Sequence, residues 1–298
     1  MTLIITLATR NRVIQVSDRR ITYRHGGNVF IRQHLNNLGD YGDEDTVKTV
    51  YAKCFDAHFA VSFTGLAEIN GRPTADFLAA ELAGVCDGPM ESVFEHFEER
   101  IVPDFQRSSI LTAFVLSGYS YWKTDNDPHV KNTLFVWSCY TTEPRSLQGG
   151  RPHDIFWSID GSIPKDSQDS LFSELQKELN AICAIRGKGQ IDRRSVGSAV
   201  EMLVRAIRRA ANHCEVGSGI GQNCTSIVLF PNARWVFTGH HKPREITQGY
   251  SPPMVLGKTI LKALMVAKQG TVLPNGTGMF RFGFHENNQV TMDQVTRW

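Results

Sequence analysis

Residues 2–18 have the sequence TLIITLATRNRVIQVSD, in which two short apolar runs flank a polar turn. The runs cover residues 3–8 and 13–17, and Asn11 and Arg12 mark the turn between them. Apolar runs of this length on either side of such a turn are typical of two antiparallel strands. The stretch therefore predicts a β-hairpin, and the rest of the sequence can be interpreted outward from it.

Further apolar patterns extend this prediction along the chain. The polar stretch 21–46 predicts a long loop or a ragged hairpin. Beyond it, apolar residues recur at strand spacing or at helical spacing, in alternating blocks. The expected strands are 47–50, 57–63, 111–116, 133–139, 155–159, 225–230 and 235–238, and the expected helices are 74–85, 90–102 and two that start at Ser167 and Ser195. Such blocks favour mostly antiparallel sheets with helices outside them, rather than a parallel sheet.

The last part of the sequence, residues 240–298, is richer in Gly, Pro and Asn than the part before it. Its patterns predict one helix over 259–268 and a hairpin around Asn287 and Asn288. We therefore expect a main domain over 1–239 and a C-terminal extension over 240–298.

The charge balance and the cysteines argue against several classes of function. The chain has 32 basic and 30 acidic residues, and this net charge of +2 gives no basis for a nucleic-acid or membrane partner. No apolar run reaches the roughly 18 residues of a membrane span, and the run at 3–8 lacks the features of a secretory signal. The six cysteines have no metal-binding spacing, so we expect reduced thiols in a cytoplasmic protein. No metal or organic cofactor is expected.

Thr2 is a candidate nucleophile because it directly follows Met1. Removal of an initiator methionine normally tolerates a small second residue, and it would leave Thr2 with a free α-amine. The hydroxyl of an N-terminal threonine can attack a carbonyl carbon while its own amine accepts the proton. The ordinary pKa of that amine, about 7.7–8.0, suits this role near neutral pH. Position alone is weak evidence, so the hypothesis depends on residues farther along the chain.

Five motifs accompany Thr2 in a fixed order. They are Asp18-Arg19-Arg20-Ile21-Thr22, Thr46-Val47-Lys48-Thr49-Val50, Ser62-Phe63-Thr64-Gly65-Leu66, the expected helix at 74–85, and Glu215-Val216-Gly217-Ser218-Gly219 before a strand. In these motifs and their order the chain resembles the proteasome β-subunit family of N-terminal-nucleophile (Ntn) hydrolases, which includes bacterial proteasome-like peptidases. The resemblance covers roughly residues 2–239.

The resemblance implies an α+β fold, namely a four-layer αββα sandwich, with the C-terminal extension added to it. It implies a threonine-type peptidase or amidohydrolase that cleaves an amide or peptide bond through an acyl-enzyme on Thr2. Because relatives assemble into rings, it also implies a homo-oligomer. An unfoldase partner is not identified by the sequence.

The same resemblance assigns roles to single residues. Asp18 orients a charge network around Lys48, whose ammonium favours the Thr2 alkoxide. The Gly65 amide faces the developing oxyanion. The remaining assignments are Glu215, Ser218 and Gly219 around the Thr2 amine, and Thr46, Phe63 and Ala67 around the pocket for the residue before the scissile bond.

The sequence also departs from the family pattern. Residues 23–45 form an insertion beside the expected site, and Glu215 replaces the usual aspartate. The serine of an expected Gly-Ser-Gly turn is displaced by one place, at Ser162. These departures keep two other functions open: a small-molecule amidase of the same fold, and a catalytically silent structural or binding member of the family.

Simpler interpretations exist for several of these residues. Asp18 and its arginines also fit a turn with a surface ion pair, and Lys48 fits a solvent-facing lysine at a sheet edge. The glycine-rich segment 217–221 follows a helix and precedes a strand, which is the wrong order for a nucleotide loop. His240 and His241 are expected in a solvated loop rather than at a metal.

Overall fold

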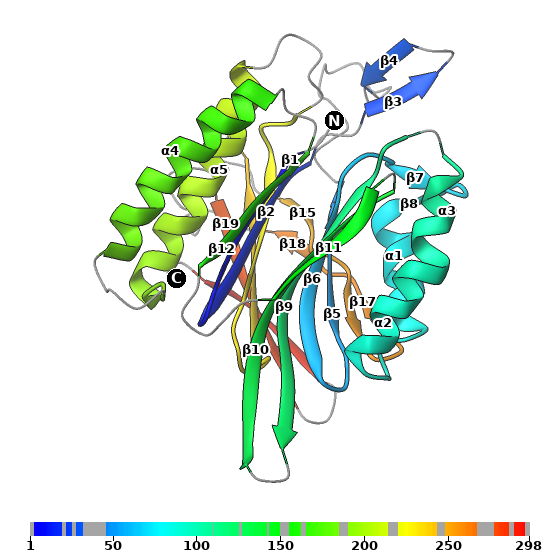
Figure 1. Cartoon of the computed structure of the whole chain (residues 1–298), viewed down its shortest axis with the longest axis vertical. Helices are drawn as coiled ribbons and strands as arrows, with labels where there is room; N and C mark the ends of the chain where they lie inside the picture. Colours follow the sequence, from blue (N-terminus) through cyan, green and yellow to red (C-terminus); the bar gives the residue numbers. More distant parts are fainter. Residues whose placement is uncertain are drawn as a thin grey trace.

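The structure, a computed structural model, describes the following residues: 3–19, 22–25, 28–31, 46–108, 110–124, 127–141, 143–149, 155–161, 165–184, 190–213, 220–242, 248–266, 277–285 and 289–295. These residues form two seven-stranded sheets and three two-stranded sheets. Two groups of helices lie on opposite sides of the large sheets (Figure 1).

The first large sheet is built around the hairpin predicted from the opening stretch. β1 (Leu3–Thr9) and β2 (Arg12–Asp18) pair antiparallel with Ile4 opposite Ser17, which confirms that prediction. The sheet has the order β12-β1-β2-β13-β14-β19-β20. Its other strands are β12 (Phe156–Gly161), β13 (Cys224–Leu229), β14 (Trp235–His241), β19 (Thr277–Phe284) and β20 (Val290–Val295).

The second large sheet has the order β11-β10-β9-β6-β5-β16-β17. β16 runs parallel to β5, and the other neighbours are antiparallel. Its strands are β5 (Thr49–Lys53), β6 (Ala57–Phe63), β9 (Ala113–Thr124), β10 (Asp127–Tyr140), β11 (Glu143–Gly149), β16 (Met254–Leu256) and β17 (Thr259–Leu261). The small sheets pair β3 (Thr22–His25) with β4 (Asn28–Ile31), β7 (Glu68–Ile69) with β8 (Arg72–Pro73), and β15 (Gln248–Tyr250) with β18 (Leu264–Val266).

One group of helices packs on each large sheet. α1 (Thr74–Ala83) contacts β5 and β16, and α2 (Met90–His96) continues through a π-helical segment, Phe97–Ile101, into α3 (Val102–Gln106). α4 (Lys165–Ala184) lies beside α5 (Val196–His213), which follows a 3-10 turn at Arg193–Ser195 and contacts β1, β2 and β13. The buried side of α5 carries apolar residues three or four apart, as an amphipathic helix requires: Val196, Val200, Leu203, Val204 and Ile207.

The described residues contain three apolar clusters. One joins α1, α2 and α3 to the second sheet, and another joins α4 and α5 to the first. The third lies between the two large sheets. It includes Ile4 and Val13 of the first sheet and Ala60 and Val115 of the second. The alternation of side chains along β1 explains this division, because Leu3 and Ile5 face the helices while Ile4 and Ala8 face the other sheet.

The predicted fold class, an α+β four-layer αββα sandwich, is wrong. Strand accounts for 45% and helix for 29% of the structure, which is mostly β-sheet. The reason is that long strands such as β9 and β10, and strands from residues after 240, enlarge the sheets beyond the area that the helices cover. β20 illustrates this, since three of its six residues are exposed.

Within the C-terminal part, the predicted helix over 259–268 is also wrong. Residues 259–261 and 264–266 form β17 and β18 instead, because their backbones pair antiparallel with β16 and β15. The predicted hairpin is confirmed by the pairing of β19 with β20, in which Phe284 lies opposite Val290. These segments add strands to both large sheets.

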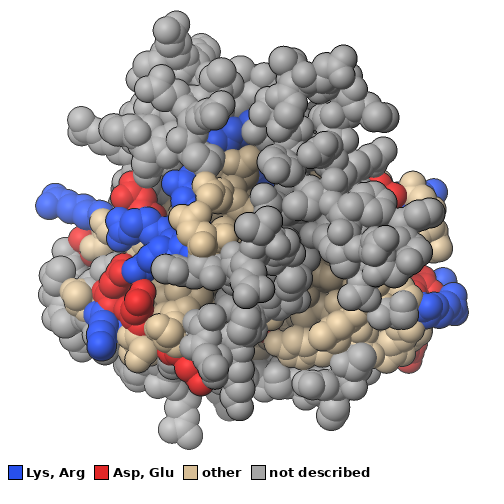
Figure 2. All heavy atoms as spheres, turned by 90° about the horizontal axis from the view of Figure 1, so that it is seen from above, with Lys and Arg blue, Asp and Glu red and all other residues tan. Residues whose placement is uncertain are grey.

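Charges on the surface are mixed in sign. On the face shown in Figure 2, Lys and Arg side chains lie beside Asp and Glu side chains. Arg209 of α5, for example, is 2.9 Å from Glu174 and 3.1 Å from Glu178 of α4. Such pairs agree with the near-balanced charge of the whole sequence.

Candidate active site

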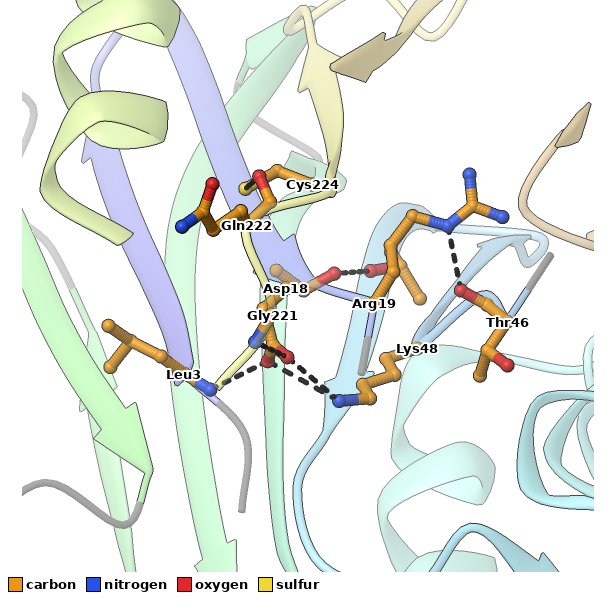
Figure 3. A network of polar contacts seen from close by, with 10 residues as sticks. Leu3, Asp18, Arg19, Thr46, Lys48, Gly221, Gln222 and Cys224 are labelled. Carbon is orange, nitrogen blue, oxygen red and sulfur yellow. Dashed lines mark hydrogen bonds and ion pairs between the residues drawn. The ribbon is translucent and has the colours of Figure 1, made fainter. Parts of the chain in front are cut away.

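Asp18, the last residue of β2, is the centre of a buried polar network (Figure 3). Its Oδ1 accepts a hydrogen bond of 2.9 Å from the Leu3 N–H, and its Oδ2 accepts one of 2.9 Å from the Gly221 N–H. The Lys48 ammonium donates to both oxygens, at 3.3 and 3.2 Å. One carboxylate thus connects the start of β1, the segment before β13 and the residue before β5.

The Asp18–Lys48 pair is almost completely shielded from water, with exposed fractions of 0% and 4%. Burying two charges costs several kcal/mol per ion, and the mutual attraction offsets this only when further hydrogen bonds satisfy the groups. The two backbone N–H donors meet that requirement for Asp18. The interpretation of Asp18 as a surface ion pair and of Lys48 as a solvent-facing edge lysine is therefore wrong.

A chain of buried hydroxyl groups holds the strands that carry this pair. The hydroxyl of Ser17, the residue before Asp18, lies 3.1 Å from the hydroxyl of Thr49, the residue after Lys48. The Thr49 hydroxyl lies 2.6 Å from the Ser62 hydroxyl, which donates to the side-chain Oε1 of Gln15 at 2.7 Å. Because these bonds join β2, β5 and β6, they fix the separation between the backbone of Asp18 and that of Lys48.

Arg19 extends the network on the other side of Asp18. Its Nε donates to the Thr46 carbonyl at 2.9 Å, and its guanidinium contacts the ring of His240. Burial, together with the Arg19 charge, lowers the pKa of His240, so this ring is neutral and able to accept. The sequence analysis assigned no role to Arg19. Its position next to Asp18 in the same motif was the feature that could have indicated one.

Gly65 lies at the same end of the second sheet as Lys48. The Phe63 N–H donates to the Lys48 carbonyl at 3.1 Å, and Gly65 follows two residues later with a φ of 88°. A side chain there would overlap the Leu111 carbonyl, so the position requires glycine. Within the part of the chain that the structure describes, the Gly65 N–H donates no hydrogen bond, which leaves it able to bind an oxygen.

The structure places the three predicted pocket residues in different surroundings. Thr46 is half-buried and accepts from Arg19 through its carbonyl. Phe63 is 3% exposed and packs in the apolar cluster under α1. Ala67 is half-buried, and its carbonyl accepts from the Thr74 N–H at 2.9 Å. Thr46 is the one that adjoins the Asp18 network.

Four predicted catalytic residues, Thr2, Glu215, Ser218 and Gly219, lie outside the described residues, as does Ser162. Their sequence neighbours are described. Leu3, which follows Thr2, and Gly221, two residues after Gly219, both donate to Asp18.

Two further groups at this end were not predicted. His240 and His241 belong to β14 and are each 1% exposed, so their expected place in a solvated loop is wrong. Asp160 of β12 lies opposite Ile4 and accepts a 2.6 Å hydrogen bond from the Tyr140 hydroxyl. Burial raises the pKa of Asp160, and the bond from Tyr140 opposes that rise.

No protein-family model matches this chain, and no curated protein is significantly similar to it. Among the described residues, none of the helices has the length and apolar character needed to cross a membrane. The same residues contain no cluster of three or more His, Cys, Asp or Glu that could hold a metal ion. An assignment of function therefore depends on the chemistry of the Asp18 network.

Proposed function

We propose that this chain is an N-terminal threonine hydrolase, similar to the proteasome β-type subunits, that cleaves an amide or peptide bond after removal of Met1. The observation that supports the proposal is the Asp18 carboxylate, which binds both the Lys48 ammonium and the N–H of Leu3, the residue joined to Thr2. By the same resemblance, the protein acts as a homo-oligomer in the cytoplasm on a peptide or amide substrate.

In the proposed reaction, the Thr2 hydroxyl attacks the substrate carbonyl carbon and passes its proton to the Thr2 α-amine. The Lys48 ammonium stabilises the developing alkoxide, and Asp18 fixes the ammonium and the chain that enters β1. The Gly65 N–H binds the oxyanion of the tetrahedral intermediate. The leaving amine takes up the proton, and water then hydrolyses the Thr2 ester and restores the hydroxyl.

The burial of the ion pair favours a catalytic role over a purely structural one. A buried ion pair is often no more stabilising than apolar side chains of the same volume, so it is weak evidence for stability. A charge held in a dry environment acts more strongly on a neighbouring nucleophile than a solvated charge does. The Asp18–Lys48 pair satisfies this condition at the point where β1 starts.

The test begins with the N-terminus of the purified protein. Intact-mass analysis should find Met1 removed, and a peptide epoxyketone should add covalently to Thr2. Thr2→Ala should abolish the adduct, whereas Thr2→Ser should keep part of it because serine retains both reacting groups. Lys48→Met should slow labelling at least about tenfold, as loss of a charge worth about 1.4 kcal/mol or more predicts. Lys53→Met, at the other end of β5, is the matched control and should label normally.

The outcomes separate the competing functions. A protein with a free Thr2 amine that resists the probe would contradict the proposal and favour a catalytically silent member of the family. A labelled protein that hydrolyses simple amides but not fluorogenic peptides would support the small-molecule amidase. Retention of Met1 would exclude Thr2 as an N-terminal nucleophile.

A further inference from the structure

A cavity of about 470 Å³ lies at the end of β5 that is remote from Lys48. Lys53, the last residue of β5, belongs to its wall, whereas Lys48 precedes the first residue of that strand. Four parts of the sequence form the wall: residues 53–55 at the end of β5, 86–87 after α1, 256–259 from the end of β16 to the start of β17, and Phe284, His285 and Gln289 at the facing ends of β19 and β20. The cavity is thus separate from the proposed active site.

The apolar part of the wall is aromatic and sulfur-rich. The Phe284 ring stacks on Tyr51, with 5.3 Å between centroids and an angle of 8° between planes. The buried thiols of Cys54 and Cys86 lie 3.4 Å apart. Their hydrogen bond and their burial raise the pKa of Cys54, so this thiol is neutral. Phe55 borders the same cavity and is 86% exposed, so its ring offers apolar surface to the solvent.

The charged part of the wall has an excess of one positive charge. The Lys258 ammonium is 3.0 Å from the Asp87 carboxylate, so these two charges compensate each other. Lys53 forms no ion pair with any residue that the structure describes. The Lys53 charge also acts on a buried neighbour. Burial lowers the pKa of His58 to about 3, and the charge of Lys53 contributes a smaller part of that shift. Among the residues that the structure describes, no anion therefore complements Lys53 at this cavity.

We propose that this cavity is a binding site for a small aromatic monoanion, whose acid group pairs with Lys53 and whose ring lies against the apolar wall. The volume falls in the range of roughly 300–1,000 Å³ that small-molecule sites occupy. Apolar surface combined with a few placed polar or charged groups is also the usual composition of such sites, in which those groups fix the orientation of the ligand. The exposed Phe55 supplies apolar surface that a ring would cover.

The probe is 2-naphthoate, a flat monoanion, and its matched neutral analogue is 2-naphthamide. Titration calorimetry on the full-length protein should find one naphthoate site, with affinity at least about tenfold higher than for the amide, since charge-assisted hydrogen bonds are worth about that factor. Lys53→Met, which keeps most of the stem but removes the charge, should weaken naphthoate binding about tenfold and leave the amide unchanged. Lys258→Met is the matched control and should change naphthoate binding less than about threefold, because Asp87 already neutralises that charge.

A second variant tests the place rather than the charge. Thr259 lies on the cavity wall and is exposed on β17, where a large aromatic side chain is tolerated, so Thr259→Trp should fill the cavity and abolish binding. Thr2→Ala should bind naphthoate like the wild type, which separates this site from the proposed active site. Circular dichroism should find every variant folded. Equal affinity for acid and amide, no naphthoate binding at millimolar concentration, or unchanged binding in folded Lys53→Met or Thr259→Trp would each overturn the proposal.

Discussion

The two lysines at the ends of β5 occupy contrasting environments. Lys48, before the strand, is 4% exposed and pairs with a carboxylate that two backbone N–H groups also bind. Lys53, at the end of the strand, faces a cavity of about 470 Å³ and forms no ion pair with the described residues. Among the described residues, a carboxylate compensates the lysine charge at one end of β5, and none pairs with the lysine at the other end.

This difference indicates what each end can do. A closed network fixes its members within narrow limits, which is what catalytic groups need. An open cavity with an excess of one positive charge has no such network, but it can accept a ligand. Each of the following predictions compares a residue at the Asp18 end with one at the cavity end, from the largest expected effect to the smallest.

The largest effect is expected from Asp18→Ala. The substitution leaves the buried Lys48 charge without its carboxylate, which should lower the free energy of unfolding by about 3–5 kcal/mol in urea denaturation. Asp87→Ala breaks an exposed pair at the cavity end and should leave the urea midpoint unchanged. The double variant Asp18→Ala, Lys48→Met should recover part of the loss. If Asp18→Ala and Asp87→Ala had the same urea midpoint, the two ends would not differ in the burial of their charges.

A smaller effect is expected from Gly65→Ala. The backbone there has a φ of 88°, and the new Cβ would overlap the Leu111 carbonyl, so the loss should be about 2–3 kcal/mol. Gly257, on the cavity wall, has a φ of 56° with nothing within 4 Å of an added Cβ. Gly257→Ala should therefore cost only the backbone strain, about 1 kcal/mol. Thermal or urea unfolding of both variants measures the contribution of crowding at Gly65.

The third prediction concerns acid, to which the two ends should respond alike. Burial lowers the pKa of His241, which lies opposite Cys224 at the Asp18 end, and of His58, which lies opposite Lys53, to about 3 in each case. Each ring is neutral when folded and takes up a proton on unfolding below about pH 6.5. The stability that each contributes is therefore complete above pH 6.5 and is lost as the pH falls toward 3. As the pH falls from 7 to 5, protonation of each histidine in the unfolded chain should lower the free energy of unfolding by about 2 kcal/mol.

His241→Asn and His58→Asn test this equality. Each should reduce the slope of unfolding free energy against pH by the same amount over pH 7–5, a range that excludes most carboxyl titration. If the slope changed in only one variant, only the histidine replaced in that variant would be buried and neutral in the folded protein.

The smallest effect is expected from Phe55→Ser at the rim of the cavity. The side chain is 86% exposed, so the free energy of unfolding should stay within about 0.5 kcal/mol of the wild type. Phe63, eight residues away and 3% exposed, supplies the comparison: Phe63→Ala should cost about 3–5 kcal/mol through the cavity it leaves. A large loss in Phe55→Ser would mean that the rim is part of the folded core.

Local patterns in the sequence predicted much of the structure, but not its class. The hairpin of β1 and β2, the strand β6 and the start of α1 were predicted at or close to their observed bounds, because periodicity and turn residues act over a few positions. The secondary structure of residues 240–298 was predicted less well. The apolar residues of 259–266 fit a helix as well as two strands, and only their pairing with β15 and β16 decided between these.

The candidate site was predicted in the same partial way. Asp18 and Lys48 were proposed as partners from a resemblance, and the structure brings them together in one ion pair. Arg19, the Gly221 N–H and Asp160 were not predicted, because each acts through a partner far away in the sequence. His240 was expected to be solvated, since nothing near it in the sequence indicates that β19 will pair along β14 and cover it.

What the sequence alone determined are the elements and the chemical groups: where strands and helices form, and which residues carry a charge or a hydroxyl. These depend on neighbours within a turn or two of the chain. Only the tertiary structure decided which charges are buried, because burial depends on the packing of distant strands. Lys48 and Lys53 show this most clearly: they are identical side chains five positions apart, and the residues that surround them come from different parts of the chain.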